Sequence, residues 1–237
     1  MCGRYTLQVS PETLAAQLEL DAVPDLAPRY NIAPTQSAPV VRLSLAEEAR
    51  VLSMMRWGLV PFWAKDLKIG NRMINARSET AAAKPAFRAA FGKRRCIVPA
   101  DGFYEWRKTP EGKQPYRIVV DDGAPFAMAG LWESWRPKDA PEEAEPLLSF
   151  TILTTKPNDK IAALHDRMPV ILAAEEIDRW LDPGATDKAA LGALLDAFPA
   201  ERMSAYPVSR GVNSPANEHP SNIEPVGARI EDEVASG

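Results

Sequence analysis

The chain opens with Met1-Cys2-Gly3-Arg4-Tyr5-Thr6-Leu7, and we expect the rest of the fold to form around this stretch. Residues 3–7 alternate in polarity as a strand does, which would tether the N-terminus in the core. If Met1 is removed, Cys2 carries a free α-amine and a thiol on neighbouring carbons. Their reference pKa values are about 7.7–8.0 and 8.5, so an appreciable fraction of the amine is nucleophilic near neutral pH. Such a pair can trap an aldehyde as an imine and then as a thiazolidine. A cysteine at position 2 without any chemical role is the alternative.

The composition is that of an ordinary globular protein, with 237 residues of which 46% are hydrophobic and 25% charged. No stretch reaches the roughly 20 apolar residues of a membrane span, and the N-terminus lacks the features of a secretory signal. We therefore predict a cytoplasmic protein that does not contact a membrane. Cys2 and Cys96 are too few for a disulfide framework, and with His165 and His219 they match no zinc-ligand spacing. We expect no metal and no cofactor.

Positive charge is concentrated in one segment of an acidic chain. Residues 65–95 contain nine Lys and Arg and two Asp and Glu, which gives +7, whereas the whole chain carries −4 and the remainder therefore −11. This distribution indicates an anionic ligand held at one place, although a solvated basic surface explains it equally well. Phe62 and Trp63 precede the segment. Such aromatic residues stack on bases at about 1–3 kcal/mol each, or they belong to the core.

Strand patterns dominate the middle of the chain. Ser10-Pro11 is typical of a helix start, and helices are also predicted at 174–181 and 187–198. Strands are predicted at 39–45, 51–57, 96–99, 103–106, 116–120, 126–132 and 148–155. We predict one α+β domain over residues 1–230, with a largely antiparallel, barrel-like sheet flanked by short helices. Residues 231–237 are predicted to be a disordered tail.

Three polar residues stand out as candidates for chemistry, each with a simpler alternative. Glu105 lies between bulky aromatic residues, where burial would raise its pKa, unless it faces solvent on an edge strand. His165 precedes an apolar strand and has charged neighbours, but a lone histidine is commonly structural. Asn75 precedes an alanine-rich helix and could simply cap it.

Together, the motifs of the chain resemble the SRAP family, the SOS response-associated peptidase-like proteins. They follow the family's order over nearly the whole chain: Met1-Cys2-Gly3-Arg4-Tyr5, Tyr30-Asn31-Ile32-Ala33-Pro34, Trp57-Gly58-Leu59-Val60-Pro61, Ile74-Asn75-Ala76-Arg77-Ser78-Glu79-Thr80, Asp101-Gly102-Phe103-Tyr104-Glu105-Trp106, His165-Asp166-Arg167-Met168-Pro169-Val170 and Val208-Ser209-Arg210.

This resemblance implies a compact fold built on a barrel-like sheet and an enzyme that processes abasic sites in single-stranded DNA. The family captures such sites as a covalent DNA–protein crosslink. By position, Cys2 is implied to become the thiazolidine, with Asn75, Glu105 and His165 as supporting catalytic residues. The residues implied to contact DNA are Arg4, Arg77 and Arg167, which would bind phosphates, and Trp63, which would stack near the lesion.

Two alternative functions remain at this stage. Cys2 could serve as the nucleophile of a peptidase or amidohydrolase, as the family name suggests. The chain could also be a non-covalent single-strand binding module in which Cys2 is incidental. Only Met1 precedes Cys2, so a methionine aminopeptidase would suffice to expose it and autoproteolysis is not needed. We expect a monomer.

Overall fold

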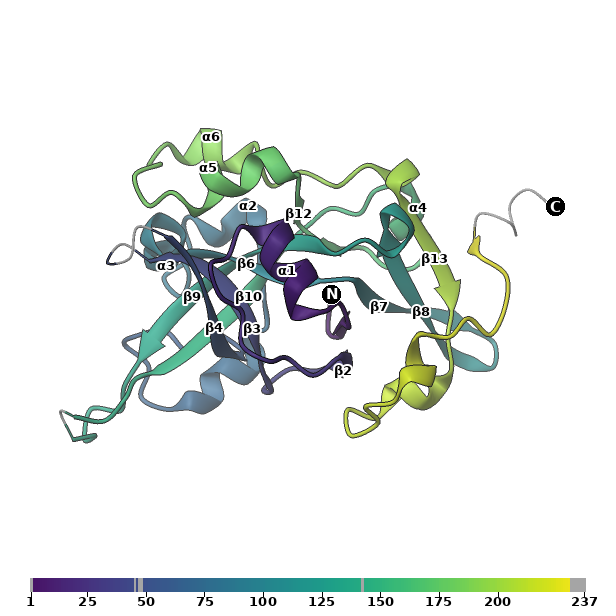
Figure 1. Ribbon diagram of the computed structural model, residues 1–237, viewed down its shortest axis with the longest axis horizontal. Helices are drawn as coiled ribbons and strands as arrows, with labels where there is room; N and C mark the ends of the chain where they lie inside the picture. Colours follow the sequence, from purple (N-terminus) through teal and green to yellow (C-terminus); the bar gives the residue numbers. More distant parts are fainter. Residues whose placement is uncertain (1, 45, 47–48, 142, 231–237) are drawn as a thin grey trace.

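Five strands of the computed structural model close into a barrel (Figure 1), and the structure describes residues 2–44, 46, 49–141 and 143–230. The barrel strands are β3 (Ser37–Ser44), β4 (Ala49–Trp57), β6 (Arg95–Ala100), β9 (Phe126–Trp135) and β10 (Leu147–Thr155). The pairs β4–β3, β3–β6, β6–β9 and β9–β10 are antiparallel. The ring closes because β10 also pairs with β4, in parallel. The predicted α+β class with a largely antiparallel, barrel-like sheet is confirmed.

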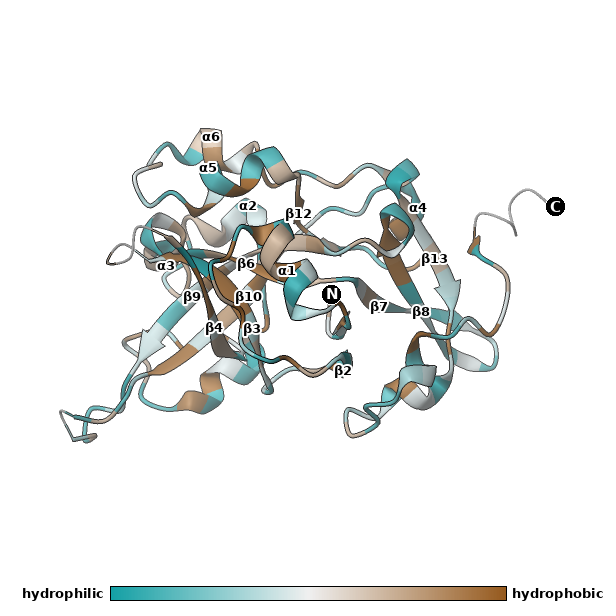
Figure 2. Ribbon diagram, viewed as in Figure 1, coloured by the Kyte–Doolittle hydropathy of each residue, from teal (hydrophilic) through white to brown (hydrophobic). Residues whose placement is uncertain are grey.

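A second, antiparallel sheet carries the N-terminal strand. Its order is β13 (Met203–Pro207), β8 (Gly112–Val120), β7 (Gly102–Thr109), β1 (Tyr5–Leu7) and β2 (Arg29–Ile32). Because β1 lies between β7 and β2, its backbone is paired on both sides. Figure 2 shows hydrophobic residues along the barrel strands and a mixture of hydrophobic and hydrophilic residues along the outer helices. The strand predicted at residues 3–7 is therefore present, three residues long, and it places Cys2 beside β7.

Aromatic packing joins the N-terminal strand to the barrel. The buried ring of Tyr5 meets Trp57 edge-on with 5.2 Å between centroids, and Trp57 stacks on Phe150 at 6.2 Å. On the other side of β1, the buried Asp101 accepts hydrogen bonds from Thr6 and from Arg117. Hydrophobic burial and a buried ion pair thus hold the strand that carries Cys2 in one register.

The helices are short and lie outside the strands. Ser10 caps the first of them through the backbone of Thr13, as predicted from the sequence. The α-helices are α1 (Pro11–Leu18), α2 (Ser78–Ala81), α3 (Arg88–Lys93), α4 (Asp159–Ala162), α5 (Ile177–Leu181) and α6 (Lys188–Gly192). The 3-10 helices are η1 (Leu67–Arg72), η2 (Asp121–Gly123), η3 (Ala174–Glu176), η4 (Ala200–Arg202), η5 (Arg210–Asn213) and η6 (Pro220–Ile223). Three short strands are β5 (Asn75–Arg77), β11 (Met168–Pro169) and β12 (Ile171–Leu172).

Two predicted helices differ from those observed. The helix predicted at 174–181 divides into η3 and α5, and the one predicted at 187–198 ends at Gly192, a residue of low helix propensity. Within the described ranges, no helix is long and apolar enough to cross a membrane. The predicted tail, 231–237, lies outside the described residues, and the domain boundary at residue 230 stays a prediction.

Candidate active site

Cys2 is fully buried and is held by its own backbone. Its thiol lies 3.9 Å from the carbonyl oxygen of Arg4, and its carbonyl oxygen accepts a hydrogen bond of 2.8 Å from Nδ2 of Asn75. Burial, followed by the charge of Glu105, raises the pKa of the Cys2 thiol far above its ordinary value. The thiol is therefore protonated at neutral pH.

Asn75 belongs to a strand and does not cap a helix. It lies in β5, which pairs in parallel with β10 so that Asn75 is opposite Ile152. The next helix, α2, begins after Arg77 and has no side-chain cap. Oδ1 of Asn75 is buried and has no hydrogen-bond partner among the described residues. Nδ2 of Asn75 thus holds the backbone of Cys2, while Oδ1 remains able to accept a hydrogen bond.

Glu105 lies on β7, in the interior of the five-stranded sheet between β8 and β1, so the alternative of a solvent-facing glutamate on an edge strand does not hold. Its side chain is 2% exposed. Burial is the largest cause of a pKa raised to about 7, and the charge of Asp166 adds to it. A carboxyl group with this pKa is partly protonated at neutral pH and can serve as acid or as base.

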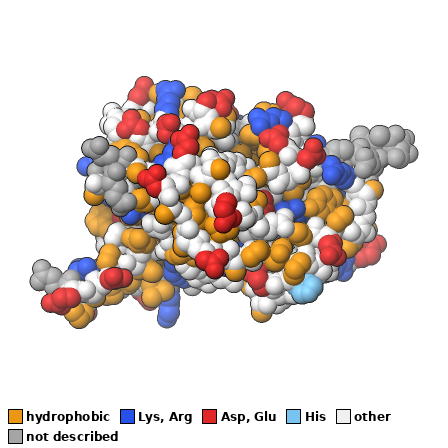
Figure 3. Space-filling model, in the orientation of Figure 1, with side chains coloured by type: hydrophobic (Ala, Val, Ile, Leu, Met, Phe, Trp, Pro, Cys, Tyr) orange, Lys and Arg blue, Asp and Glu red, His pale blue; other side chains and the backbone are white. Residues whose placement is uncertain are grey.

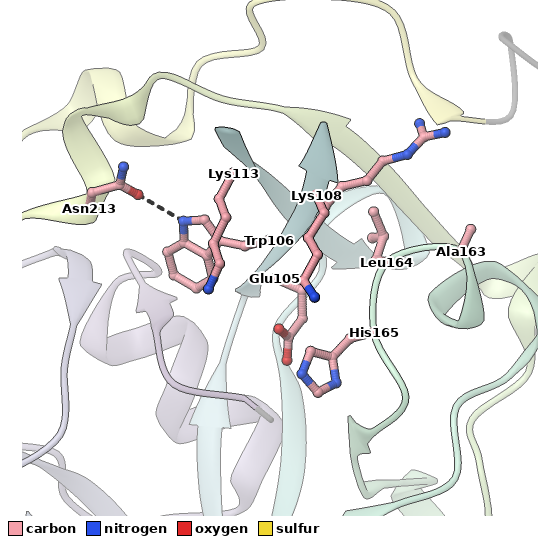
Figure 4. A pocket seen from close by; sticks show the side chains of 9 residues that line it. Glu105, Trp106, Lys108, Lys113, Ala163, Leu164, His165 and Asn213 are labelled. Atoms are coloured by element: carbon pink, nitrogen blue, oxygen red, sulfur yellow. Dashed lines mark hydrogen bonds between the residues drawn. The ribbon is translucent and has the colours of Figure 1, made fainter. Parts of the chain in front are cut away.

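His165 and Glu105 both line a cavity of 740 Å³, and Figure 4 shows the imidazole next to the carboxyl group. Its Nδ1 accepts a hydrogen bond of 3.1 Å from the backbone of Arg167 and lies 2.8 Å from Oδ1 of Asp166. Burial lowers the pKa of His165, and the positive charge of Lys113 contributes in the same direction, while Asp166 opposes it. The lowered pKa favours the neutral form of the imidazole, which lies beside the Glu105 carboxyl.

Residues not anticipated from the sequence form the rest of the cavity wall. Trp106 donates a hydrogen bond of 2.7 Å from Nε1 to Oδ1 of Asn213, which fixes the indole at the wall. Lys108 and Lys113 also line it. Trp106 directly follows Glu105 in the sequence, which was a signal available beforehand. The lysines and Asn213 come together only through the β7–β8 hairpin and the C-terminal segment.

A model of the family described as SOS response associated peptidase (SRAP) matches residues 1–215. The chain belongs to this family. Among its relatives, the abasic site processing protein YoqW of Bacillus subtilis (strain 168) is 45% identical over 228 residues, covering 94% of this chain and 99% of the relative. The abasic site processing protein HMCES of Gallus gallus is 35% identical over 236 residues, covering 87% and 69%.

Solved structures show the same SRAP fold. A crystal structure of a protein from Bacteroides thetaiotaomicron aligns with a TM-score of 0.83 at 29% identity, covering 95% of this chain and all of that one. A protein from Bordetella bronchiseptica aligns with a TM-score of 0.73 at 30% identity, covering 88% of this chain and 100% of that one. The similarity extends over both sheets, since it covers most of the chain.

In this SRAP chain, two of the three arginines predicted to contact phosphate are committed to internal partners. Arg4 donates to Oδ1 of Asn31 at 2.8 Å and to the carbonyl oxygen of Val212 at 2.7 Å. Arg167 is buried and forms a bidentate pair with Glu79, at 2.6 and 2.9 Å. Both fasten distant segments of the SRAP fold to one another. Their contact with DNA stays a prediction.

Arg77 and Trp63 are more accessible. Arg77 is exposed at the end of β5, two residues after Asn75. Trp63 is 46% exposed and lines a separate cavity of 540 Å³ whose wall includes Lys65, Lys68 and Arg72. The structure thus brings Cys2, Asn75, Glu105 and His165 of the SRAP motifs together and places Trp63 in another cavity.

Not all of the basic segment 65–95 is exposed. Arg95 is buried, and its guanidinium donates to the carbonyl oxygens of Trp180 at 2.6 Å and Phe91 at 2.7 Å. Figure 3 shows acidic side chains spread over the visible face, with fewer Lys and Arg among them. Part of the positive charge predicted for an anionic ligand therefore serves the SRAP fold itself.

Proposed function

We propose that this chain captures abasic sites in single-stranded DNA as a thiazolidine crosslink through Cys2, after removal of Met1. The observation that carries the proposal is the buried Glu105, with a pKa of about 7, close enough to Cys2 to raise the pKa of its thiol. The names of the relatives, abasic site processing proteins, support the substrate. We propose further that the protein acts as a monomer.

The first step is to open the sugar. An abasic deoxyribose is mostly a closed hemiacetal, and the aldehyde forms when the proton of the C1′ hydroxyl leaves and a proton reaches O4′. Glu105 suits this exchange because both its protonation states are populated near pH 7. His165 faces the same cavity and can hold or return the proton at O4′.

The amine then attacks before the sulfur does. The α-amine of Cys2 adds to C1′, and loss of water leaves an imine. The thiol next adds to C1′, and its proton passes to the nitrogen, which closes the ring; the balance is one aldehyde and one cysteine giving one thiazolidine and one water. This order follows because burial keeps the thiol protonated, whereas an α-amine has a reference pKa of about 7.7–8.0. Oδ1 of Asn75 can accept a hydrogen bond from the amine.

A denaturing gel tests the proposal directly. The protein is mixed with a single-stranded oligonucleotide that carries one abasic site. We expect a shifted band that is lost with Cys2→Ala and absent with an intact oligonucleotide. Cys2→Ser should give only a reversible imine, and retention of Met1 or an N-terminal tag should abolish the adduct. A tagged protein that crosslinks normally would exclude the α-amine, and a Cys2→Ser adduct as stable as that of the wild type would contradict ring closure.

Peptide or amide hydrolysis by Cys2 is the second candidate, favoured by the family's description as a peptidase. A cysteine hydrolase needs a thiolate, usually formed by a base hydrogen-bonded to the sulfur. Here the sulfur contacts the Arg4 carbonyl and its pKa is raised. We therefore expect no hydrolysis of peptide substrates. Cys2-dependent hydrolysis without any DNA adduct would favour the hydrolase over the crosslinking function. DNA binding without adduct or hydrolysis would favour a non-covalent binding module.

A further inference from the structure

Two lysines lie directly opposite one another near the tip of the β7–β8 hairpin. Lys108 and Lys113 are cross-strand partners, and Thr109 pairs with Gly112 at the turn, where Gly112 adopts a φ of 115°. Both lysines are exposed. Like charges at directly opposed positions destabilise an antiparallel pair. The hairpin therefore keeps a repulsion that a change of either residue would remove.

The protein itself does not neutralise this pair. Within residues 2–44, 46, 49–141 and 143–230, neither ammonium group forms an ion pair with a carboxylate. Asp166, the acidic residue next to His165, lies 2.8 Å from that imidazole and, in the described part of the chain, forms no ion pair with either lysine. The two positive charges are thus left for an anion from outside the chain.

Both lysines also belong to the wall of the candidate active site. They line the same 740 Å³ cavity as Glu105 and His165. In Figure 4 the two side chains run in the same direction along the hairpin, with their ammonium groups toward the end of the cavity that holds Glu105 and His165. The charge of Lys113 reaches far enough to lower the pKa of His165.

We propose that Lys108 and Lys113 together hold one backbone phosphate of the DNA strand, next to the sugar that enters the cavity. Residues directly opposed on an antiparallel pair have Cβ atoms about 5 Å apart, a separation that lets both ammonium groups contact a single phosphate. A phosphate between them replaces the repulsion with two attractions. This inference rests on the proposed function, since it assigns a contact to the same substrate.

The first test is the salt dependence of binding to an intact single-stranded oligonucleotide, measured by fluorescence anisotropy with the Cys2→Ala protein. One phosphate contact contributes a slope of about 0.7 to the plot of log Kd against log salt concentration. At 0.1 M salt this contact corresponds to about a fivefold increase in affinity. We expect the Lys108→Gln/Lys113→Gln variant to lose this slope and this affinity. The Lys108→Arg/Lys113→Arg variant should keep both. Lys138→Gln, on the loop between β9 and β10, is the matched control and should also keep both. An unchanged slope in the Gln pair, or an equal loss from Lys138→Gln, would overturn the proposal.

The second test locates the phosphate. Neutral methylphosphonates are placed one at a time around an abasic site, again in the Cys2→Ala background. Cys2→Ala with both lysines intact should lose affinity at one linkage beside the lesion, and the Gln pair should be insensitive at that linkage alone. Sensitivity of the Gln pair at every linkage to the same degree would exclude the assignment. Neither test depends on an adduct, because both use the Cys2→Ala protein. Failure of the thiazolidine chemistry would be seen separately, as absence of the crosslink in protein with Cys2 and both lysines intact.

Discussion

Replacing Glu105 by Gln should stabilise the protein, and more so as the pH rises. The pKa of Glu105 is raised from 4.5 to about 7, so the folded state binds its proton more tightly than the unfolded chain does. The contribution of the Glu105 carboxyl group to the free energy of unfolding is fully present below pH 4.5 and is lost as the pH rises through about 7. The rise in pKa corresponds to about 3 kcal/mol, because each pKa unit is worth about 1.4 kcal/mol.

Urea denaturation of both proteins at pH 5 and pH 8 measures the effect. Since Gln has nearly the shape of Glu without its charge, we expect Glu105→Gln to gain about 1 kcal/mol at pH 5 and about 3 kcal/mol at pH 8. For a domain of this size, 3 kcal/mol corresponds to about 6–12 °C in unfolding temperature. Glu145→Gln, in an exposed loop, is the control and should change neither value. If Glu105→Gln gained the same free energy of unfolding at both pH values, or gained none, the reasoning that burial sets this pKa would be refuted.

Three other substitutions test how the polar residues are used. Asp101→Asn should destabilise the fold by about 3–5 kcal/mol in urea denaturation, because it leaves the buried Arg117 without its charged partner. Glu79→Gln should tighten binding to single-stranded DNA in an anisotropy assay, because it releases Arg167 from a bidentate pair; unchanged affinity would mean that Arg167 does not reach DNA. Arg77→Gln should lower the slope of log Kd against log salt by about 0.7. Arg4→Gln should lower the unfolding temperature, because it removes the hydrogen bonds of Arg4 to Asn31 and Val212.

Local rules explain which elements could be predicted from the sequence. The start of α1 follows from Ser10 and Pro11 alone, because the cap bond to Thr13 spans three residues. The barrel strands follow from runs of apolar and β-branched residues. Even Glu105 could be singled out as buried, since bulky aromatic neighbours on a strand predict a sheet with both faces covered. These signals depend on neighbours in the chain.

Contacts between distant residues explain what could not be predicted. The closure of the barrel depends on the parallel pairing of β10 with β4, which no local pattern indicates. The charges of Arg4 and Arg167 suggested phosphate contacts, but their partners lie far along the chain, at Val212 and Glu79. A basic residue whose acceptor is supplied by another segment cannot be told from one that faces DNA by sequence alone. In the structure, Arg167 is buried, Arg4 is half-buried and Arg77 is exposed.

The low reactivity of the buried thiol is an advantage for the chemistry proposed. A thiolate at position 2 would be oxidised or would attack other electrophiles before any lesion arrived. Burial and the negative charge of Glu105 keep the sulfur protonated, so only an imine at C1′, formed by the neighbouring amine, brings an electrophile within its reach. The same burial raises the pKa of Glu105 to about 7, the value that the proposed proton exchange at the sugar requires. Burial therefore raises the pKa of both the thiol and the carboxyl group, and the fold brings the two together by pairing β1 with β7.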